Sequence, residues 1–258
     1  IQDRSEHGIK AVPVSNGRDV VLTDKDGNFS ISVADGESLF PIIPSGYTSS
    51  SGDIIRSSDF LFKTRQSKDK VDFALKKEKQ PEHFTLGAIG DIQMGNPQEL
   101  DYANQTIIPE LAGRKDIQLA VWLGDLVNNR LELFEDVREM IRCTEIPSWV
   151  LPGNHDRITN GHTLQDSLFN CYFGASAYAF NYGNVHFIIL NNVAPDSKRG
   201  YKARISDRQM TFIKNDLSYV PKDRFVVFCQ HIPLVHTENI EDLKTLLNGR
   251  NKLFALSG

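Results

Sequence analysis

Apolar runs that end close to a polar residue able to bind a cation recur through the second part of this chain. The runs cover residues 84–90, 119–124, 149–153, 225–230 and 253–258, and the first four are followed by Asp91, Asp125, Asn154 and His231. Runs of this length, separated by helical patterns, are typical of an α/β protein with a layered sheet. Since ligands in such folds bind outside the carboxyl ends of the strands, the four side chains are expected to lie near one another.

Helical periodicity fills most of the intervals between these runs. The expected helices cover residues 98–111 with a kink at Pro109, 131–142, 163–172, 206–219 and 240–247. Two further strands are expected at residues 178–182 and 185–190, on either side of Gly183-Asn184. An α/β domain with a β-sheet core flanked by helices is therefore predicted over residues 83–258.

Residues 1–77 have a different pattern, with short β-rich runs separated by turns. The expected strands cover residues 9–14, 19–23, 28–33, 38–44 and 71–75, and residues 44–53 are expected to form a loop. Frequent turns between short strands favour a small β-sandwich domain. Residues 78–82 are charged and contain Pro81, so they are the expected linker between the two domains.

The composition excludes several classes of protein. The chain has 258 residues with a net charge of −4, and it contains no long basic stretch that would suit a polynucleotide. No apolar run reaches the ~18 residues of a membrane span. Cys143, Cys171 and Cys229 make an odd number of cysteines, which argues against a disulfide framework and favours buried free thiols.

The residues after the strands have the chemistry of a metal site. Two carboxylates, an amide and an imidazole, with Gln93 as a fifth candidate, suit manganese, iron or zinc better than calcium. Any one of them taken alone is commonly a turn residue or a helix cap. Four such positions at four strand ends favour a shared function, and the glycine before Asp91, Asp125 and Asn154 allows the backbones to approach closely.

This series resembles the calcineurin-like metallophosphoesterase family. The matching motifs are Gly90-Asp91-Ile92-Gln93, Gly124-Asp125-Leu126-Val127-Asn128, Gly153-Asn154-His155-Asp156 and His231. Residues 8–17, 23–29 and 44–47 resemble the β-sandwich module that precedes this domain in a group of bacterial relatives.

The resemblance implies hydrolysis of phosphomonoesters or phosphodiesters by a two-metal, bridging-hydroxide mechanism. The two divalent ions, manganese, iron, zinc or magnesium, are expected on Asp91, Gln93, Asp125, Asn154 and His231, with Asp125 between them. The resemblance gives His155 the role of proton donor or charge stabiliser, oriented by Asp156, and gives Asn128 a structural role. The implied substrate is a small phosphoester.

The chain departs from the family pattern in two places. Gln93 stands where the family has histidine, and the family's Gly-His-x-His is present only as Gly258. The expectation is that His-x-His and a further domain follow in the parent protein, and that the present chain binds metal weakly and is impaired as an enzyme. An exported location is expected from the resemblance alone.

Two other functions are open on the sequence. The first is a non-catalytic binding or adhesion module with a degenerate site, which Gln93 and the absent histidine pair favour. Retention of the other motif residues argues against it. The second, a nuclease or nucleotide pyrophosphatase of the same family, is disfavoured because no basic surface is evident.

Overall fold

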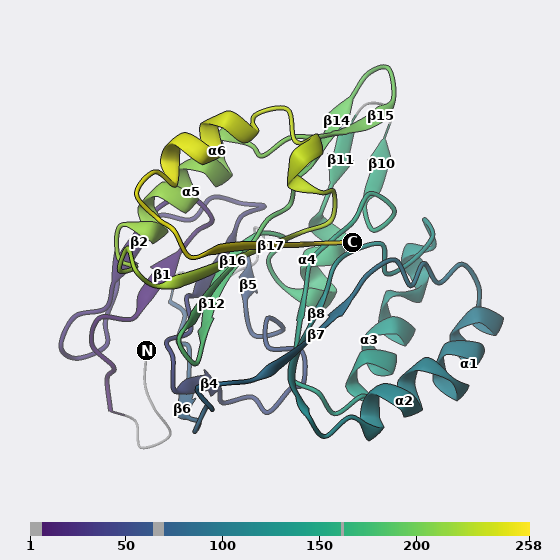
Figure 1. Cartoon of the computed structure of the whole chain (residues 1–258), viewed down its shortest axis with the longest axis horizontal. Helices are drawn as coiled ribbons and strands as arrows, with labels where there is room; N and C mark the ends of the chain where they lie inside the picture. Colours follow the sequence, from purple (N-terminus) through teal and green to yellow (C-terminus); the bar gives the residue numbers. More distant parts are fainter. Residues whose placement is uncertain (1–6, 64–69, 161–162) are drawn as a thin grey trace.

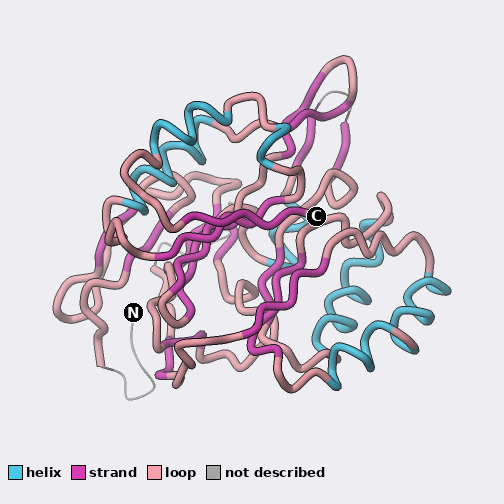
Figure 2. The backbone as a smooth tube through the Cα atoms, in the orientation of Figure 1, coloured by secondary structure: helices cyan, strands magenta, loops and turns pink. Residues whose placement is uncertain are grey.

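The computed structural model describes residues 7–63, 70–160 and 163–258 of the chain. Two β-sheets form the middle of the molecule, and helices cover the outer face of each sheet (Figures 1 and 2). The predicted layered α/β fold is therefore confirmed. The same arrangement brings the ends of strands from both sheets to one region, close to the chain's last residue (Figure 1).

The first sheet is parallel and has the order β7-β8-β9. These strands are Thr85–Ile89, Ile117–Trp122 and Ser148–Val150. Its outer face is covered by α1 (Pro97–Gln105), α2 (Ile107–Gly113), α3 (Phe134–Arg142, preceded by the 3₁₀ turn Leu131–Leu133) and α4 (Ser167–Phe173). Apolar side chains from these helices and the sheet, including Trp122 and Phe134, form one buried cluster.

The second sheet has the order β12-β13-β16-β17. Its strands are Tyr178–Tyr182, Val185–Ile189, Phe225–Gln230 and Leu253–Ser257, and only the β12–β13 pair is antiparallel. The outer face packs on α5 (Asp207–Leu217) and α6 (Ile240–Leu246), and the 3₁₀ turn Leu234–His236 precedes α6. Two hairpins extend beyond the sheets in Figure 1: β10 (Ile158–Asn160) with β11 (Thr163–Gln165), and β14 (Val193–Asp196) with β15 (Gly200–Ala203).

The N-terminal part is an all-β region, as predicted. It contains β1 (Pro13–Ser15), β2 (Val20–Leu22), β3 (Ser38–Pro41), β4 (Tyr47–Ser49), β5 (Leu61–Phe62) and β6 (Leu75–Lys77). One sheet has the order β2-β1-β3-β5, and β4 pairs with β6 in a second. The boundaries proposed at 77 and 83 stay a prediction.

The N-terminal region shares its core with the α/β part. Phe40 of β3 is fully buried, with its ring centroid 5.8 Å from that of Phe212 and 6.3 Å from that of Tyr178. Between the two central sheets, Trp149 stacks on Phe180 at 3.8 Å. All of these residues belong to a single buried cluster, so the two parts of the chain are joined by apolar packing as well as by residues 78–82.

The N-terminal region also covers edges of both central sheets. Ile55 forms a parallel bridge with Ser148 of β9, and Arg56 N–H donates to the Ser148 carbonyl at 2.9 Å. Ile43 forms a parallel bridge with Phe180 of β12. These pairings satisfy backbone groups that an open sheet edge would leave free.

Several predicted strands and loops of the N-terminal region were wrong. Residues 28–33 form no strand, because they lack a paired ladder; the Ser32 carbonyl accepts from the Asn16 side chain instead. The predicted loop at 44–53 contains β4, which pairs with β6. The last strand begins at Leu75, where the sequence predicts strand over residues 71–75.

Two predicted helices also differ. The helix expected over residues 98–111 breaks at Thr106, and Pro109 lies in the first turn of α2, where a missing N–H costs nothing. The helix expected over residues 163–172 begins only at Ser167, since β11 takes residues 163–165. Cys143 and Cys171 are exposed and only Cys229 is buried, so the expectation of three buried thiols was wrong.

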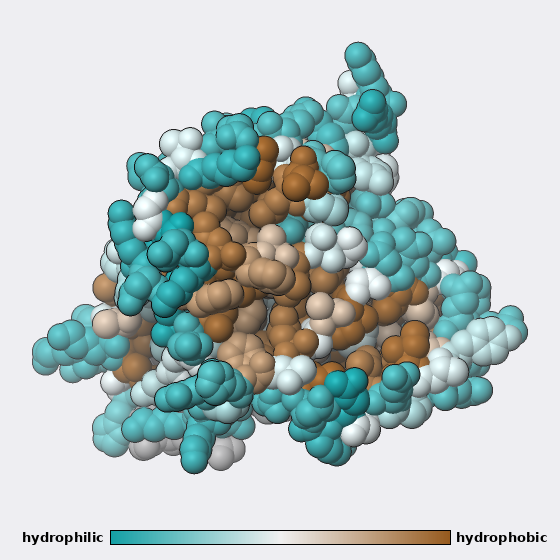
Figure 3. All heavy atoms as spheres, viewed as in Figure 1, coloured by the Kyte–Doolittle hydropathy of each residue, from teal (hydrophilic) through white to brown (hydrophobic). Residues whose placement is uncertain are grey.

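The surface carries an apolar area on the face shown in Figure 3. Apolar side chains gather in the middle of this face, over β17 and β7 of Figure 1. Leu253 and Phe254 of β17 contribute, with exposed fractions of 37% and 54%. In the described ranges, the structure has no helix long and apolar enough to cross a membrane.

Candidate metal centre

The loops after β7 and β8 run side by side and present three acidic or amide side chains. Asp91 N–H donates to the Gly124 carbonyl at 3.2 Å, and Gln93 N–H donates to the Asp125 carbonyl at 2.8 Å. Asp91, Gln93 and Asp125 have positive φ angles of 54°, 43° and 50°. The paired, left-handed backbones turn the chain sharply where each strand ends.

The loops after β8 and β9 approach each other so closely that Gly124 and Gly153, two of the glycines before candidate ligands, have no room for a side chain. A Cβ added to Gly153 would lie 2.0 Å from Asp125 Oδ1, and one added to Gly124 would lie 2.6 Å from the Gly153 nitrogen. Gly124 also has a φ of +90°, which side chains rarely adopt. The loops after β8 and β9 are therefore in contact only because both positions are glycine.

Asp125 is the buried carboxylate of the site. It is 2% exposed, and its Oδ1 accepts the His155 backbone N–H at 2.9 Å. Burial disfavours the ionised form of Asp125, but hydrogen bonds from the His231 ring and the His155 N–H hold its pKa below the usual value. Asp125 is thus an anion held inside the protein, the state in which it can bind a cation.

His231 is oriented with one ring nitrogen toward this carboxylate. Its Nδ1 lies 3.0 Å from the Leu123 carbonyl and acts as the donor there, which leaves Nε2 facing Asn154 Oδ1 at 3.2 Å and Asp125 Oδ2 at 3.5 Å. Burial opposes a charged ring, but the hydrogen bond and charge of Asp125 raise the His231 pKa overall. Metal-ligating histidines commonly donate their other N–H to a backbone carbonyl in this way.

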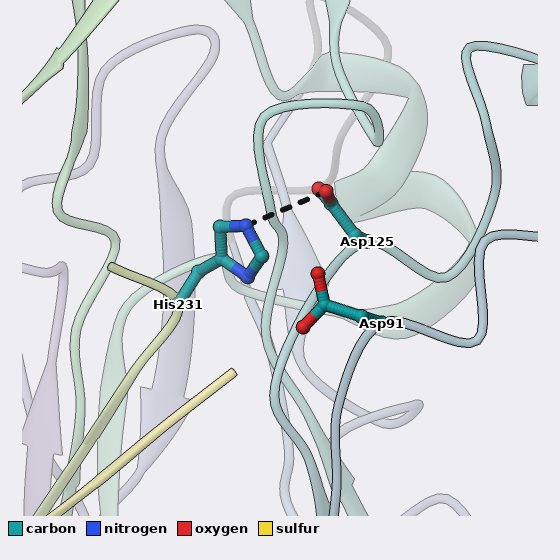
Figure 4. Close-up of side chains that lie close together, drawn as sticks. All are labelled: Asp91, Asp125 and His231. Atoms are coloured by element: carbon teal, nitrogen blue, oxygen red, sulfur yellow. Dashed lines mark ion pairs between the residues drawn. The ribbon is translucent and has the colours of Figure 1, made fainter. Parts of the chain in front are cut away.

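Asp91, Asp125 and His231 form the cluster shown in Figure 4. One ligand atom from each lies within 4.8 Å of the others, and the side chains come from the ends of β7, β8 and β16. Gln93 Nε2 lies 3.1 Å from Asp125 Oδ2 and 3.5 Å from Asp91 Oδ1, so the amide contacts both carboxylates. The mixed oxygen and nitrogen donors, with a buried anion at their centre, fit divalent transition metals.

His155, Asn128 and Gly258 differ in how they lie relative to this cluster. His155 joins the cluster, with Nε2 3.9 Å from Asp125 Oδ2. Asn128 is exposed and contributes its backbone, since its N–H donates to the Met94 carbonyl at 3.0 Å. Gly258, at the end of β17, lies against the cluster, because a Cβ there would be 2.8 Å from His231 Nδ1 and 3.0 Å from Asp91 Oδ2.

The expected orientation of His155 by Asp156 was wrong. Asp156 is completely buried, and its two oxygens accept the backbone N–H groups of Val127 at 3.0 Å and Gly153 at 2.8 Å. Among the residues described, the structure gives His155 Nδ1 no hydrogen-bond partner. Burial raises the pKa of Asp156 to about 6, despite these backbone donors. Asp156 therefore fastens the Asn154-His155 loop to the loop after β8.

Sequence reasoning missed two asparagines at this end of the molecule. Asn191 and Asn192 follow β13 and are 7% and 0% exposed. Asn192 bonds to the backbone of Ile232, directly after His231. Their only sequence signal is their position after the apolar run at residues 185–190, the same signal that marks Asp91, Asp125 and His231.

Comparison with known proteins identifies the family of this chain. Residues 84–253 match the family described as calcineurin-like phosphoesterase, and residues 1–78 match its N-terminal domain. The chain therefore belongs to the calcineurin-like phosphoesterase family, and the resemblance read from the motifs is confirmed.

One curated relative and two solved structures illustrate the similarity. A 3′,5′-cyclic-nucleotide phosphodiesterase of Nostoc sp. is 26% identical over 144 residues, which are 55% of this chain. The chain spans about half, 51%, of the length of that relative. A dimetal phosphatase from Danio rerio is 16% identical, with a TM-score of 0.46 over 66% of this chain and 80% of that one. A purple acid phosphatase from yellow lupin, Lupinus luteus, is 15% identical, with a TM-score of 0.48 over 98% of this chain and 54% of that one.

Proposed function

We propose that this chain hydrolyses small phosphoesters with the help of two divalent metal ions. The observation that carries the proposal is the cluster of Asp91, Asp125 and His231, whose ligand atoms lie within 4.8 Å of one another where strands of both sheets end. Family membership supports it, since it makes phosphoester hydrolysis the expected chemistry.

The residues divide into two groups around Asp125. Asp91 and Gln93, whose side chains contact each other, are our candidates to hold a first ion, and Asn154 and His231, which also contact each other, are our candidates to hold a second. Asp125 contacts both groups and is the candidate bridging ligand. When bound, such ions act as Lewis acids and lower the pKa of bound water toward ~7.

The protein groups have roles of their own in this proposal. Asp125, held as an anion in a buried position, balances the charge of the cations. The His155 ring is partly exposed, at 31% of its side chain, and Nε2 points toward the cluster. In this proposal it donates a proton to the leaving oxygen or stabilises charge on the phosphate.

A phosphodiester is the substrate class we favour, because the curated relative acts on cyclic nucleotides. The test is turnover of 3′,5′-cyclic AMP, an aryl phosphodiester and an aryl phosphomonoester with added Mn²⁺, Zn²⁺ or Mg²⁺. We expect metal-dependent turnover that Asp125→Asn abolishes and that His155→Ala lowers by about 10²–10⁴-fold. A faster rate on the monoester would overturn the substrate class alone.

Metal content separates this proposal from the non-catalytic alternative. Purified protein that turns over none of the esters and binds no metal would favour a binding module. Protein that binds two metals without turnover would show that the cluster is a metal site and that the catalytic part of the proposal is wrong. Whether His-x-His follows Gly258 in the parent protein stays a prediction.

A further inference from the structure

Two neighbouring asparagines connect the separate loops that carry Asn154 and His231. Asn191 and Asn192 follow β13 after one residue, and β13 is the one inner strand of the second sheet that supplies no candidate ligand. Both side chains are buried, and both bond to groups outside their own strand. The question is what these bonds hold in place.

Asn192 holds the backbone that leaves His231. Its Nδ2 donates to the Ile232 carbonyl at 2.6 Å, and its Oδ1 accepts the Ile232 N–H at 3.2 Å. Residues 231–233 lie between β16 and a 3₁₀ turn, and the pairing with the last strand ends at the His231 carbonyl, which accepts the Gly258 N–H at 3.0 Å. A single buried side chain therefore satisfies both backbone groups of the residue that follows the candidate ligand.

Asn191 acts on the other loop through two charged residues. Its Nδ2 donates to Asp166 Oδ2 at 2.6 Å, and Asp166 in turn forms an ion pair with Arg157. Arg157 is 8% exposed, directly follows Asp156, and also donates Nη1 to the Val193 carbonyl. The chain that leaves Asn154-His155-Asp156 is thus tied to Asn191 and Val193.

The backbone of Asn191 and Asn192 is itself held by hydrogen bonds to Gln209 and Arg204. Gln209 of α5 accepts the Asn191 N–H at 3.0 Å through Oε1 and donates Nε2 to the Asn191 carbonyl at 2.7 Å. The Arg204 N–H donates to the Asn192 carbonyl at 2.8 Å. A rigid support of this kind can set the distance between two loops that share no strand.

We propose that Asn191 and Asn192 are positioning residues that hold the Asn154 loop and the His231 loop at the spacing needed for one metal ion. The role assigned to that ion rests on the proposed function, but the bracing of the two loops does not. Asn192 acts on His231 through Ile232, and Asn191 acts on Asn154 and His155 through Asp166 and Arg157. Outer partners of metal ligands commonly change metal affinity by 10–100-fold when they are replaced.

The test compares Asn192→Leu with a matched control, Asn239→Leu. Asn239 is 8% exposed and makes the same two-way contact with Ile205, at 2.9 Å and 3.1 Å, but it adjoins no candidate ligand. The first readout needs no metal: the ring ¹⁵N signals of His155 and His231 are recorded by NMR in the presence of a chelator. The second is Mn²⁺ affinity by calorimetry.

We expect Asn192→Leu to shift the His231 ring signals and Asn191→Leu to shift those of His155. Each is expected to weaken binding of one Mn²⁺ by about 10–100-fold. Asn239→Leu should lower the melting temperature without either effect. Equal effects of all three variants, or unchanged ring signals in both asparagine variants, would overturn the proposal.

Two complications have defined outcomes. If Asn192→Leu fails to fold, Asn192→Ala replaces it, since it removes both bonds to Ile232 without adding a larger side chain or a charge. If the unchanged chain binds no Mn²⁺, the proposed function fails, and the ring signals alone decide whether the two asparagines hold the loops.

Discussion

At the scale of single residues, the candidate site is built on backbone conformations that most side chains avoid. Asp91, Gln93 and Asp125 all have positive φ angles. Each such residue costs of order 1–3 kcal/mol and persists only where the surrounding structure enforces it. Strain of this kind clusters at functional sites, and here it aims two carboxylates and an amide at a common point. The sequence predicted the residues but not their conformation, because glycine before each aspartate signals a turn without specifying the next φ.

The first prediction concerns Gln93, the residue that departs from the family pattern. We expect Gln93→His to tighten binding of Zn²⁺ or Mn²⁺, because imidazole is a better ligand for these ions than an amide. Histidine also tolerates positive φ better than most residues do, which suits the φ of 43° at this position. Isothermal titration with each metal measures the change, and Gln93→Ala is the control that should bind no more tightly than the unchanged chain. Weaker binding by Gln93→His would show that position 93 is not a ligand.

The second prediction concerns Gly153. A methyl group there would lie 2.0 Å from Asp125 Oδ1, so Gly153→Ala must push the loops after β8 and β9 apart. We expect metal binding to be lost and the free energy of unfolding to fall by about 1–3 kcal/mol, as in other overpacked sites. Gly113→Ala is the matched control, since nothing lies within 4 Å of the added methyl group at the end of α2. Metal content and urea unfolding check both variants, and normal metal content in Gly153→Ala would contradict the prediction.

At the scale of elements, strand ends were predictable and long-range pairings were not. Asp91, Asp125 and His231 meet because strands of a layered sheet end at a common edge, and a reader of the sequence can apply that rule. Asn191 and Asn192 obey the same rule, but an amide after a strand is also an ordinary turn residue, so they did not stand out. The pairing of Ile55 with Ser148 depends on how two distant segments meet, which no local pattern encodes.

Residues 54–56, which pair with the edge strand β9, are held in place by an ion pair between Asp53 and Arg142. Asp53 accepts hydrogen bonds from Arg142 at the end of α3, at 3.1 Å from Nε and 2.5 Å from Nη2. Burial disfavours the Asp53 anion, but the Arg142 bonds hold its pKa below the usual value. The pair links the N-terminal region to the helix that leads into β9, the strand before Asn154.

The third prediction concerns this pair. The pKa of Asp53 is lower in the folded state than in the unfolded state, where it is near 3.8. The stabilisation that the Asp53 anion gives to the fold is therefore complete above the unfolded pKa and is lost as pH falls through the lower folded pKa. We expect Asp53→Asn to lower the free energy of unfolding by about 1–3 kcal/mol at pH 7, with the difference shrinking below about pH 4. Urea unfolding at a series of pH values measures it.

The control for Asp53 is an ion pair on the surface. Asp116 and Arg114 form a two-bonded pair that is open to solvent, so Asp116→Asn should change stability less at every pH. An Asp53→Asn effect that stays constant down to low pH would show that packing, and not charge, is what the substitution removes.

At the scale of the whole molecule, the N-terminal region and the α/β part share one buried cluster. Phe40 and Phe60 of the first part lie against Tyr178 and Trp149 of the second. The linker predicted at residues 78–82 is itself held, because Gln80 accepts from the Gly46 and Gly183 N–H groups at 2.8 and 2.9 Å. Two parts of a chain joined in this way are expected to unfold together.

The fourth prediction follows from the shared core. We expect Phe40→Ala to lower the free energy of unfolding by about 3–5 kcal/mol and to shift the whole molecule in a single transition. Tryptophan fluorescence reports on Trp122 and Trp149 of the α/β part, and far-ultraviolet circular dichroism reports on all of the chain. The two curves should coincide in the unchanged chain and in the variant.

The control is Leu22→Ala, because Leu22 lies on β2 with 40% of its surface exposed. It should leave both curves almost unchanged. A Phe40→Ala variant whose fluorescence transition stays where it was would show that residues 1–77 unfold independently.

The contacts between the N-terminal region and later segments can form only after those later segments have been synthesised. The Ser57 hydroxyl donates to the Phe173 carbonyl, 116 residues further along the chain. Ribosomes add about 5–20 residues per second, so Ser57 is made roughly 6–23 s before its partner. Until the later segments are made, Phe40 lacks its partners Tyr178 and Phe212, and residues 54–56 lack Ser148. Residues 1–77 are therefore synthesised before the segments that cover their apolar side, and a chaperone can protect them in that period.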